Sequence, residues 1–120
     1  MRLQAALTTL AALLSLGAAD RLRVNIEEDL NQNYKYSNGR WDSAFGTSPV
    51  DPQDGCRDPP HVPGMNRLCL DWNAKHRRGH FYFDNQGKRC IKFAWFSPRK
   101  PCPAKKVCYT WYLDEVQCTW

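Results

Sequence analysis

The chain has 120 residues, of which 17 are Lys or Arg and 12 are Asp or Glu, so its formal charge is +5. This length excludes barrel enzymes, doubly wound nucleotide-binding sheets and polytopic membrane proteins, which need longer chains. Hydrophobic residues make up 42% of the sequence and aromatic residues 12%, a composition that argues against intrinsic disorder. We therefore expect one small folded domain.

The first 19 residues have the pattern of a secretory signal peptide. Arg2 supplies a positive start, residues 5–16 are almost entirely Ala and Leu, and small residues precede a cut after Ala19. A membrane anchor is the weaker interpretation, because the apolar run is shorter than the ~20 residues that cross a bilayer. We predict that residues 1–19 are removed and that the remaining chain is secreted, extracellular and without a membrane span.

Residues 20–55 differ in charge from the rest of the chain. Acids outnumber bases by eight to five over residues 20–58, whereas eleven bases face four acids over residues 59–120. Residues 48–55 are rich in Pro, Asp and Gly, which is typical of turns. We interpret residues 20–55 as an acidic, extended or loosely ordered arm. A short packed strand around Tyr34–Trp41 and a propeptide are the alternatives.

Six cysteines follow this arm. Their number is even and the predicted compartment is oxidising, so we expect three disulfides rather than a metal site. Zinc is disfavoured because the sequence has no Cys-x-x-Cys pair, and no cofactor or metal is expected. Spacing alone leaves fifteen pairings open. The cysteines are Cys56, Cys69, Cys90, Cys102, Cys108 and Cys118.

The region 56–120 contains two segments with a structural pattern. Residues 81–95 consist of two aromatic runs around a polar turn with Asn85 and Gly87, which predicts a β-hairpin. Residues 107–118 suit either a short helix or a further strand, because aromatic and β-branched residues are mixed there with a possible helical face.

The residues around these cysteines resemble a known family. Cys56 is followed by Pro59 and Pro60, and Phe81-Tyr-Phe-Asp84 precedes Cys90 and Phe93-x-Trp95. This order resembles the Kunitz domain of the pancreatic trypsin inhibitor type, although the loops before Phe81 and after Phe96 depart from the family. The resemblance implies a small disulfide-rich α+β fold over residues 56–120, with a twisted β-hairpin and a short helix. It also implies the pairs Cys56–Cys118, Cys69–Cys102 and Cys90–Cys108.

The same resemblance implies a function. Kunitz domains inhibit serine proteases by inserting a loop anchored at their second cysteine, which is Cys69 here. The reactive loop is then Leu68, Cys69, Leu70 and Asp71, with Leu70 as the residue that enters the protease pocket. An apolar Leu70 favours a chymotrypsin- or elastase-like pocket over a trypsin-like one. We therefore expect a monomeric inhibitor-like protein of the kind found in saliva and venoms.

A basic surface offers the alternative function. Such a surface would suit a non-inhibitory ligand of an ion channel, a host receptor or a sulfated glycan, whereas nucleic acid is not expected as a partner of a secreted chain. Solvated loop charges that keep the domain soluble are the plainer interpretation. The basic residues are Lys75, Arg77, Arg78, Arg99, Lys100, Lys105 and Lys106.

No catalytic motif is present. The sequence lacks His-Glu-x-x-His and Gly-rich phosphate loops, and its cysteines are all expected in disulfides. His76 and His80 have helical metal-ligand spacing, but Gly79 and the cationic neighbours argue against a metal site. We therefore expect a binding protein without catalytic residues rather than an enzyme.

Overall fold

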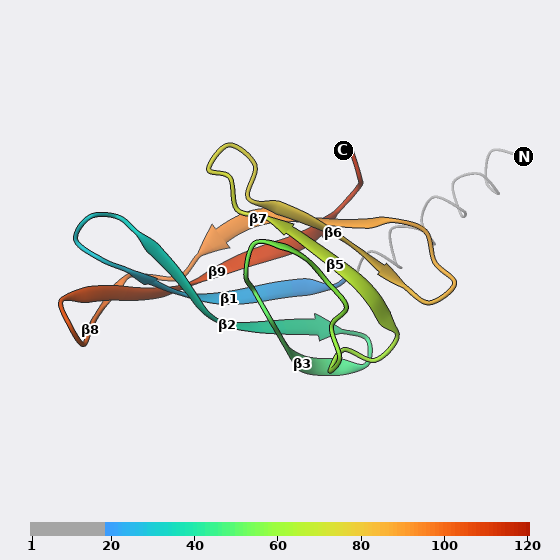
Figure 1. Ribbon diagram of the computed structural model, residues 1–120, viewed down its shortest axis with the longest axis horizontal. Coiled ribbons are helices and arrows are strands. Elements are labelled where there is room, and N and C mark those ends of the chain that lie inside the picture. The colour runs from blue at the N-terminus through green and yellow to red at the C-terminus, as the bar shows by residue number, and fades with distance from the viewer. Residues whose placement is uncertain (1–18) are drawn as a thin grey trace, which may run out of the picture.

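The computed structural model describes residues 19–120, and these residues form an all-β protein (Figure 1). The predicted leader lies outside the described residues except for Ala19. The strands are β1 (Arg21–Glu28), β2 (Tyr34–Ser43), β3 (Gly46–Val50), β4 (Gly55–Arg57), β5 (Met65–Asp71), β6 (Arg78–Phe83), β7 (Arg89–Phe96), β8 (Lys100–Cys102) and β9 (Lys106–Val116).

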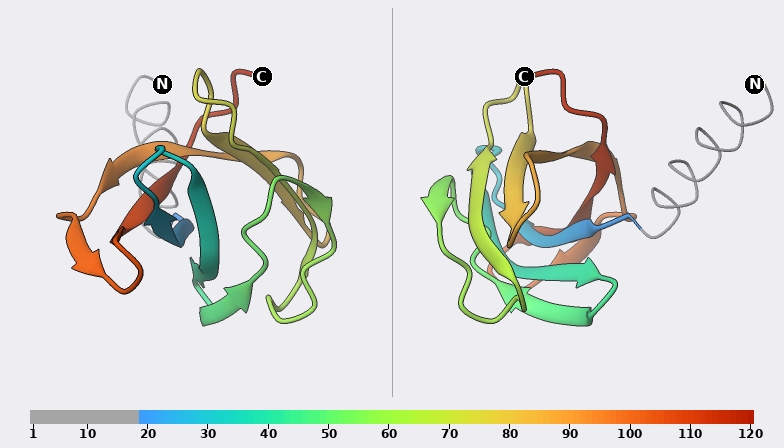
Figure 2. Two further views of the ribbon diagram at one scale, coloured as in Figure 1. Left: turned by 60° about the vertical axis from the view of Figure 1, so that its left-hand side comes forward. Right: turned by 90° about the vertical axis from the view of Figure 1, so that its right-hand side faces the viewer.

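All nine strands belong to one antiparallel sheet. Its order is β3-β2-β1-β9-β7-β6-β5-β4, and β8 pairs with β9 outside this path. The sheet is strongly curled (Figure 2), so that strands far apart in the order meet across its concave face. Trp41 of β2 lies 4.7 Å from Phe81 of β6 between ring centroids, although three strands separate β2 from β6 in the sheet.

The concave face holds the core because apolar residues alternate along the strands. In β1, Leu22, Val24 and Ile26 are buried, while the residues between them are polar. Successive side chains of a strand point to opposite faces, so this period of two places one apolar row inside. The residues of β9 that pair with these three are Leu113, Trp111 and Tyr109, and they are also buried.

The expected α+β fold class is wrong, because the described residues contain strands and no helix. The segment over 107–118, for which helix and strand were both open, forms most of β9. The side chains of β9 point alternately into the core and away from it. Its backbone pairs with β1 on one side and with β7 on the other. A helix would satisfy neither ladder, so tertiary pairing decides the structure of this segment.

Two further expectations concern the hairpin over residues 81–95 and the arm over residues 20–55. The predicted hairpin is present, since β6 and β7 pair from Arg78↔Lys92 to Phe81↔Arg89. Residues 20–55, interpreted as a loosely ordered arm, instead contribute β1, β2 and β3, with β1 in the interior of the sheet. The alternative of a packed strand around Tyr34–Trp41 matches β2.

All six cysteines form disulfides, but the pairs implied by the Kunitz resemblance are wrong. The structure joins Cys56–Cys69, Cys90–Cys118 and Cys102–Cys108. Cys56 and Cys69 face each other in the β4–β5 ladder, whereas Cys102 and Cys108 close the β8–β9 hairpin. Each disulfide therefore joins segments that the sheet already brings together.

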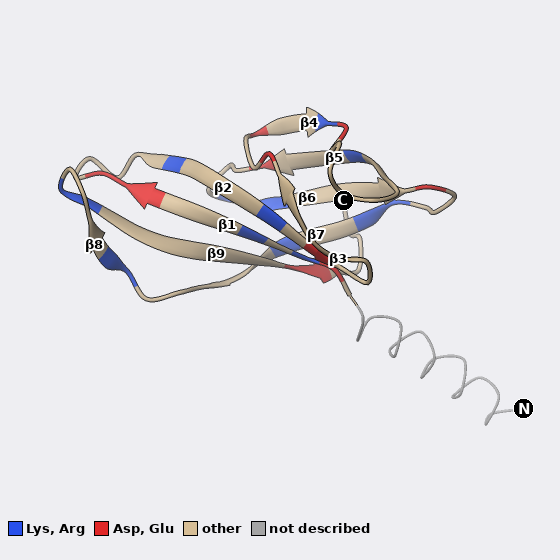
Figure 3. Ribbon diagram, turned by 90° about the horizontal axis from the view of Figure 1, so that it is seen from below, with Lys and Arg blue, Asp and Glu red and all other residues tan. Residues whose placement is uncertain are grey.

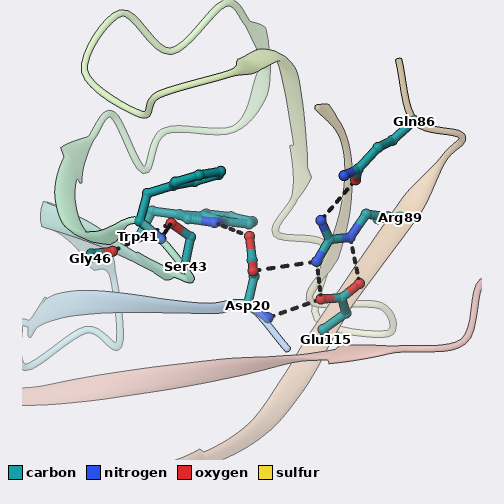
Figure 4. A network of polar contacts seen from close by, with 8 residues as sticks. Asp20, Trp41, Ser43, Gly46, Gln86, Arg89 and Glu115 are labelled. Atoms are coloured by element: carbon teal, nitrogen blue, oxygen red, sulfur yellow. Dashed lines mark hydrogen bonds and ion pairs between the residues drawn. The ribbon is translucent and has the colours of Figure 1, made fainter. Parts of the chain in front are cut away.

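A network of buried charges closes the end of the sheet where β1 begins (Figure 4). Arg89 donates two hydrogen bonds of 2.7 Å to Glu115 and one of 3.3 Å to Asp20. The Trp41 indole N–H donates to Asp20 at 2.7 Å. Burial raises the pKa of the Asp20 carboxyl, while Trp41 and Arg89 act in the opposite direction. The network ties β1, β2, β7 and β9 together.

The disulfides should differ in how much they stabilise the fold. Replacing Cys90 and Cys118 by Ala should lower the free energy of unfolding by about 3.5 kcal/mol, because the bond closes a loop with a sequence separation of 28. Replacing Cys102 and Cys108 should cost about 2 kcal/mol, since their separation is 6. Denaturant unfolding measures both variants, and an equal or reversed order would contradict the prediction.

Candidate functional site

The end of the sheet opposite the Asp20 network is lined by aromatic rings. Tyr34 at the start of β2 lies 5.4 Å from Trp111 of β9, and Phe93 of β7 lies 5.7 Å from the same ring. Phe96, at the end of β7, lies 6.0 Å from Tyr109. We call this set the aromatic mouth: Tyr34, Phe93, Phe96, Tyr109 and Trp111.

Two arginines lie on the rings of the aromatic mouth. The Arg77 guanidinium lies 4.5 Å from the ring centroid of Trp111 and 5.5 Å from that of Tyr34. The Arg99 guanidinium lies 5.0 Å from the ring centroid of Tyr109. Cations attract the negative faces of aromatic rings, which holds both guanidinium groups in place at the mouth.

The two arginines differ in their acidic neighbours. Arg99 approaches Glu28 at 3.7 Å, and the Tyr109 hydroxyl donates to the same carboxylate at 2.7 Å. Within residues 19–120, no carboxylate lies at ion-pair distance from Arg77. The buried Nε of Arg77 also has no hydrogen-bond partner. Arg77 therefore presents a positive charge that this part of the chain does not neutralise.

Arg77 owes its position to the connection between β5 and β6. The amides of His76 and Arg77 both donate to the carbonyl of Asn73, which forms a tight turn. The turn ends with Arg77 at φ 40°, in the left-handed region, and the Arg77 carbonyl accepts a hydrogen bond from the Phe93 amide at 2.9 Å. The backbone of Arg77 is thereby fixed beside β7.

The other predicted basic residues are divided among three places. Arg78 lies away from the mouth, with its guanidinium 4.6 Å from the Trp120 ring. Lys75 is exposed in the β5–β6 connection. Lys100, Lys105 and Lys106 belong to the β8–β9 hairpin, where Figure 3 shows basic residues at the tip of the sheet. The predicted patch is thus not one surface, and only Arg77 and Arg99 share the aromatic mouth.

The predicted reactive loop lies in an interior strand. Leu68, Cys69, Leu70 and Asp71 all belong to β5, which pairs with β4 and β6. The exposed fractions of Leu68 and Leu70 are 0% and 3%, so neither side chain is available to a protease pocket. Asp71 accepts a backbone hydrogen bond from Asn73 and contacts His76 at 2.9 Å, which together lower its carboxyl pKa.

A groove also lies on the outer face of the sheet, beside the β8 hairpin. Polar side chains of Asn25, Ser37 and Thr110 line it, together with Pro98 and Lys100. Nearby on this face, Trp95 stacks on Tyr112 at 4.1 Å between centroids.

In residues 19–120, no group of three or more His, Cys, Asp or Glu side chains is placed to hold a metal ion. The same residues include no helix of the length and hydropathy needed to span a membrane.

Sequence reasoning found Arg77 and Arg99 but missed the rings beneath them. Tyr34, Phe93 and Trp111 come from three strands that are distant in sequence, so no local spacing connects them. The available signal was the alternation of apolar residues in β9, at Tyr109, Trp111 and Leu113, which marks an inward row but does not show which other rows it meets.

The phenol of Tyr109 gives a direct test of the mouth's geometry. Burial and the hydrogen bond to Glu28 raise the Tyr109 pKa above its ordinary value, while Arg99 lowers it. Replacing Glu28 by Gln should therefore lower this pKa, and replacing Arg99 by Gln should raise it further. Absorbance titration of the phenolate, with Tyr109→Phe to assign the signal, measures both changes. Shifts in the opposite directions would contradict the contacts described.

The chain was also compared with known proteins. No family model, no curated protein and no solved structure matches it. Membership of the Kunitz family is therefore a prediction without support from these comparisons, and the fold and disulfide pairs that it implied are not those of the structure.

Proposed function

We propose that the protein is an extracellular binding protein that recognises a sulfated glycan at the aromatic mouth. The observation that carries this proposal is the Arg77 guanidinium, which lies on Trp111 and Tyr34 without a carboxylate partner in the described chain. Three disulfides are compatible with an extracellular location.

An uncompensated guanidinium favours an anionic ligand. Guanidinium groups bind planar and tetrahedral oxyanions through paired N–H donors, and such charge-assisted hydrogen bonds are about twice as strong as neutral ones. Because Arg77 rests on aromatic rings, its environment is less polar than bulk water, which strengthens its attraction to an anion. Of the mouth's two arginines, Arg99 has its charge partly offset by Glu28.

The rings favour a ligand that also has a packing surface. Tyr34 and Phe96 are 37% and 48% exposed, so each presents part of its ring to solvent beside the arginines. Sugar rings carry faces of C–H groups that pack against aromatic rings, while their sulfates supply the anion. Exposed Lys75 and Lys105 extend the positive field around the mouth, which would increase the association rate of a polyanion.

Protease inhibition is not the function that the geometry favours. The predicted contact residue, Leu70, is buried in β5, and its strand is paired on both sides. An inhibitor of the expected type needs a convex, accessible loop at this position. Inhibition of a serine protease stays a prediction from the sequence, and a panel of chymotrypsin-, elastase- and trypsin-like enzymes would test it.

Neighbouring arginines provide a matched test of the proposed site. Arg77→Gln should weaken binding to immobilised heparin by about 10- to 150-fold, since a lost charged hydrogen bond costs ~1.5–3 kcal/mol. Arg78→Gln removes the same charge at a place beside Trp120, away from the mouth, and should change affinity less than about twofold. Affinities at several salt concentrations measure both effects, since screening weakens contacts between exposed charges.

Two results would contradict this proposal. If both variants lose affinity equally, then binding follows net charge rather than the aromatic mouth. If neither sulfated nor unsulfated glycans bind the unmodified protein, then the ligand class is wrong. Desulfated heparin is the ligand control, and circular dichroism of each variant shows that the sheet has kept its structure.

Exposed aromatic residues give a second, independent test. Phe96→Ala should weaken glycan binding about three- to tenfold without changing the charge, because it removes packing surface at the mouth. Phe45→Ala is the control, since Phe45 is 71% exposed in the β2–β3 turn, which lies at the other end of β2. Equal effects of the two substitutions would show that the aromatic mouth does not contact the glycan.

A further inference from the structure

The backbone nitrogen of Asp20 occupies a special place in the charge network at the start of β1. It lies 2.9 Å from Oε1 of Glu115 and donates a hydrogen bond to it (Figure 4). The bond that precedes this nitrogen is the peptide bond between Ala19 and Asp20, which the leader pattern identifies as the site of cleavage. After cleavage the same nitrogen is an α-ammonium group.

The network lacks one positive charge while this peptide bond is intact. The side chains of Asp20 and Glu115 are 4% and 8% exposed, and Arg89 is their shared cationic partner. Two buried carboxylates therefore face one guanidinium. A buried charge is costly unless it is paired, and an ammonium group on Asp20 would bring the network to two positive and two negative charges.

The main chain around Asp20 holds the nitrogen at this position. The Glu115 amide donates to the Asp20 carbonyl at 3.1 Å, which continues the β1–β9 ladder beyond the Arg21↔Asp114 pair. Trp41 fixes the Asp20 side chain from the other side. The new ammonium could not leave Glu115 without breaking these contacts.

We propose that removal of residues 1–19 turns the Asp20 nitrogen into an α-ammonium that forms a buried ion pair with Glu115 and so stabilises the processed protein. The proposal rests on the predicted cleavage after Ala19 and is independent of glycan binding. Hydrolysis of the Ala19–Asp20 peptide bond consumes one water and leaves a carboxylate on Ala19 and the ammonium on Asp20. Processing and folding stability are thereby connected.

The ion pair has a defined pH dependence. An ammonium that is stabilised in the folded protein has a pKa above the ~7.7–8.0 of an ordinary α-amino group. Its contribution is therefore complete below the unfolded pKa and is lost as the pH rises through the higher folded pKa. The stabilisation should be present at pH 6.5 and absent at pH 10.5.

The experiment compares two forms of the disulfide-bonded chain. One begins at Asp20, and the other carries Gly-Ser-Ala19 before Asp20, so that the Asp20 nitrogen stays an amide. At pH 6.5 we expect the unfolding equilibrium constant of the form beginning at Asp20 to be at least about tenfold smaller. At pH 10.5 the two forms should unfold alike. Guanidinium chloride would screen the ion pair, so unfolding in urea is the appropriate measurement.

The same pair of chains with Glu115→Gln is the matched control. This substitution keeps a hydrogen-bond acceptor near the nitrogen and removes its charge, so the difference between the two forms should fall to less than about threefold. Equal stability of the two forms in the unmodified background would overturn the proposal. A difference that persists undiminished with Glu115→Gln would overturn the choice of partner.

The position of the cut is tested separately. The full chain is expressed in eukaryotic cells, and mass spectrometry determines the first residue of the secreted product. A product that begins at Asp20 supports the proposal, whereas a product that begins at another residue, or retention of the leader, overturns it. Neither result depends on whether the protein binds heparin.

Discussion

The structure depends on the double pairing of β1. This strand pairs with β2 along one edge and with β9 along the other, and it joins the β2–β3 hairpin to the remaining strands. Its inward residues Leu22, Val24 and Ile26 are almost wholly buried. The two ends of β1 also support the two polar regions of the molecule, because Asp20 belongs to the buried charge network and Glu28 contacts Tyr109 and Arg99 at the aromatic mouth.

Arg89 in the charge network and Arg77 at the aromatic mouth are held in place by different kinds of contact. Arg89 is held by the carboxylates of Asp20 and Glu115. Its positive charge is therefore paired inside the protein, and it stabilises the structure. Arg77 is held by aromatic rings and by the backbone of its turn, neither of which neutralises it. Cation–π contacts fix the position of a guanidinium while leaving its edge able to bind an anion. That difference distinguishes the paired charge of Arg89 from the charge of Arg77, which has no carboxylate partner in residues 19–120.

Sequence reasoning succeeded where the information was local. The β6–β7 hairpin was predictable because both of its strands and its turn lie within one short segment. The central strand β1 was missed even though Leu22, Val24 and Ile26 alternate with polar residues, since the acidic composition of residues 20–55 favoured an arm. The aromatic mouth could not be predicted, because Tyr34, Phe93 and Trp111 lie on β2, β7 and β9, and these strands come together only through pairing between distant segments. Long-range pairing determines both features, and a single sequence carries little information about it.

The buried position of Leu70 follows from the disulfide that the sequence did not identify. Cys56 and Cys69 are directly opposite each other in the β4–β5 ladder, so their bond holds Cys69 in a strand. Neighbouring side chains of a strand point to opposite faces. Leu68 and Leu70 therefore both point away from the face that carries the disulfide, and they enter the core with the inward residues of β6. A cysteine in this setting cannot anchor an exposed inhibitory loop, although its neighbours in sequence resemble those of one.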